Sequence, residues 1–231
     1  MSTRDDMVLA AERLFARFGV DGVSLRQIGA AAGQRNVAAA QYHFGDKQTL
    51  LQAIYDFRLA AIDARRRELL DAVRASGSAG DVRALVEVLV VPLAEQAAAP
   101  GSHYVRFLNR MCDHQGRALL PLSEVGPVNS ALEVGHLILD ALGGAAGGNP
   151  LRDDPRARQR GELAGRLIIA GLADLEHRLR PDTDGTADVT ADAGSGPDAG
   201  LELDPAEYAD GVVDAVVAVL TAPVPVRRRP R

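Results

Sequence analysis

Several things are scarce in this sequence of 231 residues, and each absence excludes something. Cys112 is the single cysteine, so no intramolecular disulfide can form. No uncharged run reaches the roughly 18 residues that a membrane helix needs. Charges at Arg4, Asp5 and Asp6 leave no apolar segment for a secretory signal. We therefore expect a soluble, cytoplasmic protein with no membrane segment.

Aromatic residues make up only 4% of the chain, whereas hydrophobic residues of all kinds make up 47%. Alanine, leucine and valine dominate the apolar set, and no strand pattern competes with helical spacing. The sequence thus predicts an all-α protein whose core is built from small and medium side chains. Its length allows one large domain or two small ones.

Charge is unevenly distributed along the chain. The net charge is −5, but residues 1–74 hold 11 basic and 9 acidic groups, and residues 75–231 hold 15 and 22. The basic groups include one lysine, Lys47; the others are arginines. The acidic excess therefore lies outside the N-terminal part, which is mildly basic, so its charge permits nucleic-acid binding.

Apolar residues at helical spacing predict nine helices. A first helix over 4–18 ends at Gly19, a second starts from a Ser24 cap, and Gly33 makes the turn to the third. Asp46 caps the fourth, and Pro92 is expected to kink or split the fifth. The predicted ranges are 4–18, 24–32, 36–42, 47–74, 82–98, 103–116, 127–142, 155–180 and 205–221.

These helices suggest a division of the chain into three parts. Residues 1–50 form a three-helix helix-turn-helix domain, residues 51–222 form a helical ligand-binding and dimerisation domain, and residues 223–231 form a basic tail. Within the second part, residues 181–204 contain acidic residues and no basic one, so we expect a disordered acidic loop.

Polar side chains surround the short third helix. A helix-turn-helix places its second helix in the major groove of DNA, where arginine suits guanine and asparagine or glutamine suits adenine. Helix starts near Ser24 and Lys47 favour phosphate. The DNA-binding residues expected on this basis are Ser24, Arg26, Gln34, Arg35, Asn36, Gln41, Tyr42, His43 and Lys47.

The same stretch resembles the TetR family of transcriptional regulators over about residues 5–55. The resemblance is carried by FxxxG at Phe15, S-x-R-x-I-x-x-x-A-G at Ser24 and Y-H-F-x-x-K-x-x-L at Tyr42. It implies an all-helical homodimer with an N-terminal DNA-binding domain and a C-terminal domain that binds a small molecule. Gln41 stands where the family commonly has tyrosine, and the preceding turn is one residue longer, so Tyr42 can take over the phosphate contact.

Each of these residues also has a purely structural interpretation. Tyr42, His43 and Phe44 can be packing residues that close the three-helix unit, and for Phe44 this is the expected role. Arg35 and Lys47 can be ordinary solvated residues at helix starts.

The C-terminal helices supply candidate surfaces for a second subunit and for a ligand. The apolar stripes of 155–180 and 205–221 either pair with a second copy in a four-helix bundle or serve the intrachain core. A ligand is expected in the bundle of 82–142 and 155–180, although the residues proposed to line it can be plain core. Those residues are Leu89, Phe107, Met111, Leu137 and Ile168.

No metal site, cofactor or catalytic set is expected. Cys112 and His114 are two residues apart on a predicted helix, which places them on different faces. The predicted function is a DNA-binding repressor released from an inverted-repeat operator by a small molecule. The alternatives are a ligand-independent dimeric regulator or activator and, more remotely, a helical small-molecule enzyme with a vestigial DNA-binding domain.

Overall fold

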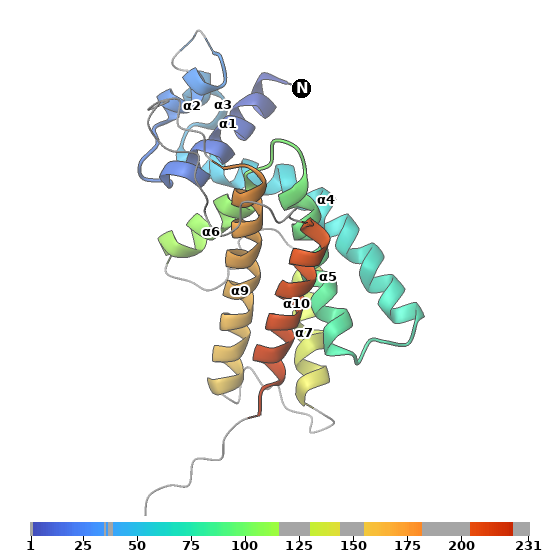
Figure 1. Ribbon diagram of the computed structural model, residues 1–231. Coiled ribbons are helices and arrows are strands. Elements are labelled where there is room, and N and C mark those ends of the chain that lie inside the picture. Colours follow the sequence, from blue (N-terminus) through green and yellow to red (C-terminus); the bar gives the residue numbers. More distant parts are fainter. Residues whose placement is uncertain are drawn as a thin grey trace, which may run out of the picture.

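The computed structural model describes residues 2–34, 36, 39–115, 130–143, 155–181 and 204–223 (Figure 1). The regular structure in these ranges is entirely α-helical, which confirms the predicted all-α class. The helices, numbered as in Figure 1, are α1 (Thr3–Phe18), α2 (Leu25–Ala31), α3 (Ala39–Phe44), α4 (Lys47–Ala75), α5 (Val82–Ala98), α6 (Tyr104–Gln115), α7 (Ser130–Gly143), α9 (Pro155–Leu179) and α10 (Pro205–Thr221).

Side-chain caps explain where several helices begin. Ser24 and Asp46 accept the N–H groups of Gln27 and Thr49, so the predicted caps of α2 and α4 are both confirmed. Such caps satisfy backbone donors that have no partner inside the helix. Asp81 and Asp204 cap α5 and α10 in the same way.

The third helix differs from the prediction of residues 36–42, because it spans Ala39–Phe44. At its start, Asn36 lies in the preceding bend, where its carbonyl accepts the N–H of Ala39 at 3.0 Å. At its end, Gly45 adopts a φ of 73° and donates its N–H to Gln41. Glycine reaches this left-handed conformation without a steric penalty, so α3 continues to the residue before it.

Pro92 does not split α5, which is one helix from Val82 to Ala98. Proline lacks the N–H that would bond back one turn along the helix, so it weakens the ladder locally. The residue is buried, and α5 packs against α4, α7, α9 and α10. This surrounding contact holds the helix together across the missing hydrogen bond.

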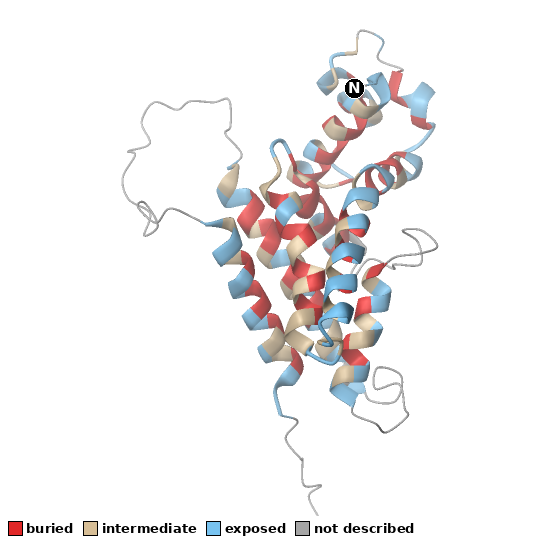
Figure 2. Cartoon of the chain, turned by 90° about the vertical axis from the view of Figure 1, so that its right-hand side faces the viewer, coloured by how far each residue is buried: buried red, intermediate tan, exposed pale blue. Residues whose placement is uncertain are grey.

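The helices form two connected groups. At one end of the molecule, α1 packs on α2 and α4, and α3 packs on α2 and α4. In the larger group α10 lies beside α9 and α5, and α6 lies between α9 and α1 (Figure 1). Buried residues line the inner faces of both groups, and exposed residues face outward (Figure 2).

The predicted division at residue 50 falls inside α4, which continues unbroken to Ala75, and it remains a prediction. The predicted acidic loop at 181–204 and basic tail at 223–231 lie outside the described residues, apart from Pro181, Asp204 and Pro223. Across the described ranges, no helix is both long and apolar enough to span a bilayer.

Replacing Gly45 with alanine should lower the free energy of unfolding by about 1–2 kcal/mol, the cost of a left-handed conformation for an L-residue. A Cβ at Gly45 meets no atom within 4 Å, so backbone strain alone is tested. Gly80→Ala is the matched control, because Gly80 also has open space but no positive φ. Equal losses in denaturant titrations of both variants would contradict this explanation.

Candidate nucleic-acid interface

Helices α1, α2 and α3, with the start of α4, enclose an apolar centre that is the N-terminal end of one continuous hydrophobic core. Phe44, predicted to be a core residue, is only 4% exposed. The guanidinium carbon of Arg4 lies 5.2 Å from the centre of its ring. This centre fixes how α3 presents its outer face. Its other buried members include Met7, Val8, Phe15, Ile28, Ala40, Leu50 and Ile54.

Ser24 and Arg26 lie at the start of α2, and both are exposed. The Ser24 hydroxyl donates to the Gln27 side-chain oxygen at 2.7 Å and accepts the Gln27 N–H at 3.3 Å. The same Gln27 oxygen accepts the Ser24 N–H at 2.8 Å. Ser24 thus shapes the helix start, while the Arg26 cation stands beside it on the surface.

The turn between α2 and α3 is held by Gln34. Its side-chain amide donates to the carbonyl of Ala32 at 3.1 Å, and its backbone N–H donates to Gly29 at 3.0 Å. Asn36 is exposed in the bend that follows. Arg35, the residue expected to read guanine, lies outside the described residues, so its role remains a prediction.

The outer face of α3 carries Gln41, Tyr42 and His43, all exposed. Tyr42 is 85% exposed, so the interpretation of Tyr42 as core is wrong. Its ring stands edge-on to that of His43, with centroids 5.5 Å apart. The Gln41 amide donates to the carbonyl of Gly45, which draws this side chain toward the end of the helix.

Lys47 makes a contact that the sequence did not indicate. Its ammonium group donates to the carbonyl of Val20 at 2.9 Å and ties the start of α4 to the loop between α1 and α2. The side chain is half-buried, and an ammonium group has three donors. A phosphate contact by Lys47 therefore stays a prediction, with one donor already used within the protein.

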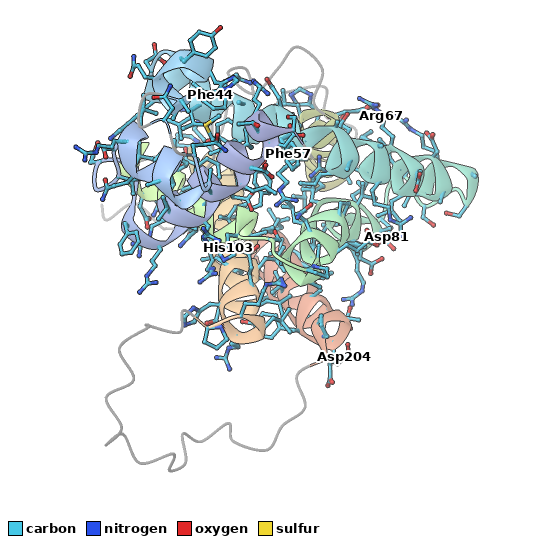
Figure 3. The ribbon with its side chains drawn as sticks, turned by 90° about the horizontal axis from the view of Figure 1, so that it is seen from above. Phe44, Phe57, Arg67, Asp81, His103 and Asp204 are labelled. Atoms are coloured by element: carbon cyan, nitrogen blue, oxygen red, sulfur yellow. The ribbon has the colours of Figure 1, made fainter. Side chains whose placement is uncertain are left out.

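The predicted residues that the structure describes thus lie on α2, the following turn, α3 and the start of α4, at one end of the molecule (Figure 1). Figure 3 looks down on this end and labels Phe44, the last residue of α3. The nearby carboxyl of Asp46 is occupied as a cap. Hydrogen bonds from the backbone and side chain of Thr49 hold the pKa of Asp46 below its ordinary value. The surface combines polar and aromatic side chains on the short helix α3 with cationic side chains at the starts of α2 and α4, which is the chemistry that duplex DNA accepts.

A buried carboxylate joins this end to the rest of the protein. Glu12 of α1 is 1% exposed, and its oxygens accept Nε and Nη2 of Arg58 on α4 at 2.7 and 3.0 Å. The backbone N–H of His103, immediately before α6, donates to the same carboxylate at 2.8 Å. We call these three groups the Glu12 joint. Its partners lie 46 and 91 residues away, so sequence spacing gives no sign of it.

A second buried carboxylate meets the start of α6 from α9. Glu176 accepts the Ser102 hydroxyl at 3.0 Å and the backbone N–H of Arg106 at 2.8 Å. Burial raises the pKa of Glu176, and these hydrogen bonds oppose that rise. The first turn of α6 is therefore held between a helix of the N-terminal group and a helix of the C-terminal group.

Replacing Glu12 with glutamine should lower the free energy of unfolding by about 3 kcal/mol, because it leaves Arg58 without its buried counter-charge. Glu95→Gln is the matched control: Glu95 is also bridged by an arginine, Arg65, but both side chains are largely exposed. Its expected loss is below about 1 kcal/mol. Similar losses in chemical denaturation would show that burial of the Glu12 joint contributes nothing.

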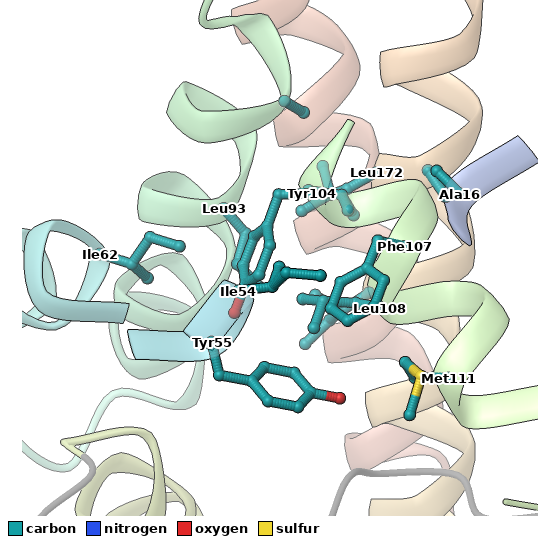
Figure 4. Close-up of a cluster of buried hydrophobic side chains, with 14 of the residues drawn as sticks. Ala16, Ile54, Tyr55, Ile62, Leu93, Tyr104, Phe107, Leu108, Met111 and Leu172 are labelled. Carbon is teal, nitrogen blue, oxygen red and sulfur yellow. The ribbon is translucent and has the colours of Figure 1, made fainter. Parts of the chain in front are cut away.

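The residues expected to line a ligand site all belong to, or pack against, the main core. Phe107, Met111 and Ile168 are buried, and Leu89 and Leu137 are partly buried against the same cluster. Figure 4 shows Phe107 and Met111 within it, beside Tyr55 and Tyr104. The structure thus brings these residues into one apolar interior, and their contact with a ligand remains a prediction.

Residues 8–54 match the family model described as bacterial regulatory proteins, tetR family. The match runs from α1 through α2 and α3 to the first turns of α4, which are the elements that form the candidate interface. No match to the chain was found among curated proteins. The protein is therefore a DNA-binding transcriptional regulator with an N-terminal domain of the TetR family.

Proposed function

We propose that the protein is a dimeric repressor that a small molecule releases from its operator. The observation that carries this proposal is the Glu12 joint, in which a helix of the DNA-binding domain shares a buried carboxylate with the start of α6. Movement of α6 within the C-terminal core would thereby reach the DNA-binding end.

Contact with DNA is assigned to four of the exposed residues described above and to the half-buried Lys47. Gln41, Tyr42 and His43 on α3 would face the major groove, and Arg26 and Lys47 at two helix starts would meet phosphates. Tyr42 suits this role because a ring so fully exposed contributes little to the fold.

Release requires that the ligand bind two arrangements of the protein unequally. Helix α6 contacts both α1 and α9, and its first turn is bonded to carboxylates from both. A ligand that displaces α6 would therefore either break the Glu12 joint or carry α1 with it. In both cases α3 would be presented differently to DNA.

Dimerisation is assigned to the outer faces of α9 and α10. Much of the stripe predicted for this purpose is used inside the chain, because Leu172 and Leu175 are fully buried. Leu163 remains 51% exposed, and the small residues Ala215 and Ala218 leave the outer side of α10 open to close approach. A C2 dimer built here would present two α3 helices to successive major grooves, roughly 34–36 Å apart.

One observation favours the ligand-independent alternative. The side chains expected to line a pocket, such as Phe107 and Met111, are packed within the main core. In that case the C-terminal domain would serve dimerisation alone, and the protein would act as a constitutive repressor or an activator.

Arg26→Ala should weaken binding to specific and unrelated duplexes alike and reduce the slope of log affinity against log salt by about 1. Arg74→Ala is the matched control, since it removes the same charge from an exposed position at the far end of α4, outside the proposed DNA and dimer surfaces. Fluorescence anisotropy at several salt concentrations measures both slopes. An unchanged slope for Arg26→Ala, or an equal change for Arg74→Ala, would remove the phosphate assignment.

Selection of bound duplexes from a random pool, with and without a cell-metabolite extract, tests the function as a whole. The expected product is an inverted repeat with half-sites about one helical turn apart. We expect the extract to reduce recovery of that repeat. A product without symmetry would refute the dimer, and undiminished recovery would favour the ligand-independent regulator.

A further inference from the structure

Arg66 lies on the inner side of α4, where a charged side chain is not expected. It stands one turn after Ile62 and one turn before Leu70, and both of these residues are buried. Arg66 itself is 4% exposed. Arginine is rarely buried to this extent unless an anion accompanies it.

The N–H groups on Nε and Nη1 of Arg66 have no hydrogen-bond acceptor among the residues that the structure describes. The closest carboxylate is that of Asp63, whose Oδ1 is 3.9 Å from Nη1. This distance allows charge attraction but no hydrogen bond. The guanidinium is thus held in the interior with donors unsatisfied.

Asp63 is already occupied by other donors. Its Oδ1 accepts the backbone N–H of Ser130 at 2.9 Å and the Ser130 hydroxyl at 2.5 Å, and its Oδ2 accepts Arg67. One carboxylate therefore serves two arginines and the start of α7. The side chains of Asp63, Arg66 and Arg67 together carry a net charge of one positive unit.

Burial without a full partner carries an energetic penalty. Desolvation lowers the pKa of Arg66, and the attraction of Asp63 only partly opposes it. A buried donor without an acceptor destabilises a folded protein unless another molecule supplies that acceptor. The missing component at this position is one negative charge with oxygen acceptors.

We propose that Arg66 binds the carboxylate of a small organic monoanion whose apolar body lies against the neighbouring hydrophobic cluster. Ile62, Leu93 and Tyr104, from α4, α5 and the start of α6, stand together in that cluster (Figure 4). This inference rests on the proposed function and specifies the chemical class of its ligand.

The surroundings favour a single negative charge. A monoanion would bring the net charge of this group of side chains to zero. A phosphate dianion would instead leave an excess negative charge beside Asp63 in an apolar interior. Carboxylate oxygens also match the guanidinium N–H groups in geometry. An apolar body is favoured because Ile62, one turn before Arg66 on α4, and Tyr104, which interacts electrostatically with Arg66, are both buried.

The position also connects to the DNA-binding end. Tyr104 is the first residue of α6 and is buried, and its hydroxyl lies within Coulombic reach of Arg66, Glu12 and Arg58. A carboxylate at Arg66 would thus arrive one side chain away from the Glu12 joint.

The test uses the full chain and two pairs of probes: octanoate with octanamide, and benzoate with benzamide. Within each pair the apolar body is the same and only the charge differs. We expect at least one acid to bind, by titration calorimetry and by a raised melting temperature, at least tenfold more tightly than its amide. Arg66→Gln should remove this preference, whereas Arg65→Gln, on the exposed side of α4, should keep it.

Folding of the variants gives an independent readout. Because the guanidinium is buried without an acceptor, Arg66→Met should melt at or above the temperature of the unaltered protein when no probe is present. A clearly lower melting temperature would show that Arg66 supports the fold and would overturn the proposal. Equal affinity of acid and amide, retention of the preference in Arg66→Gln, or no binding of either acid at millimolar concentration would also overturn it.

The same probes separate this inference from the proposed function when operator affinity is measured beside binding. Arg66-dependent binding of an acid without loss of operator affinity would refute release and support the carboxylate site. Release by a neutral metabolite, unchanged by Arg66→Gln and without Arg66-dependent binding of either acid, would support release and refute the carboxylate site.

Discussion

The carboxylate of Glu12 is the constraint on which the arrangement of the two helix groups depends. A buried charge is tolerated only where its oxygens are satisfied, and here the donors come from α4 and from the residue before α6. Apolar contacts between α1 and its neighbours have no donor–acceptor geometry, whereas a guanidinium that bonds both oxygens fixes distance and orientation together. The orientation of α3 therefore depends, through α1, on the position of α6.

Buried acids at helix starts recur as the connecting device of this chain. Glu12 and Glu176 meet the first turn of α6, and Asp63 meets the first turn of α7 through Ser130. The N-terminal end of a helix carries unsatisfied N–H groups and a partial positive charge, so a carboxylate from another helix both caps it and joins the two. These buried carboxylates all accept hydrogen bonds. The buried guanidinium of Arg66 differs from them, because its Nε and Nη1 donors have no acceptor among the described residues.

Local signals were enough to predict most of the fold. Apolar spacing and the Ser24 and Asp46 caps place most helix ends to within a few residues, because both depend on neighbours in the chain. The limits of α3 were missed, because the bend at Asn36 delays its start and because Gly45, which ends the helix as Gly19 ends α1, was not used as the stop signal. Exposure of Tyr42, the contact from Lys47 to Val20 and the Glu12 joint depend on distant parts of the chain, and residue spacing carries no information about such pairs.

The contrast between packing and hydrogen bonding bears on how a signal can cross this protein. Core side chains such as Phe107 and Leu172 are buried and make apolar contacts, which have no required donor–acceptor geometry. The Glu12 joint cannot adjust in this way, because a shift of about one ångström at His103 would leave its N–H bond unmade. The start of α6 must then either keep its bond and take α1 with it, or lose the bond and leave the buried Glu12 carboxylate with Arg58 as its remaining partner in the joint. A small displacement in the core is thereby converted into a choice between two arrangements of the DNA-binding end.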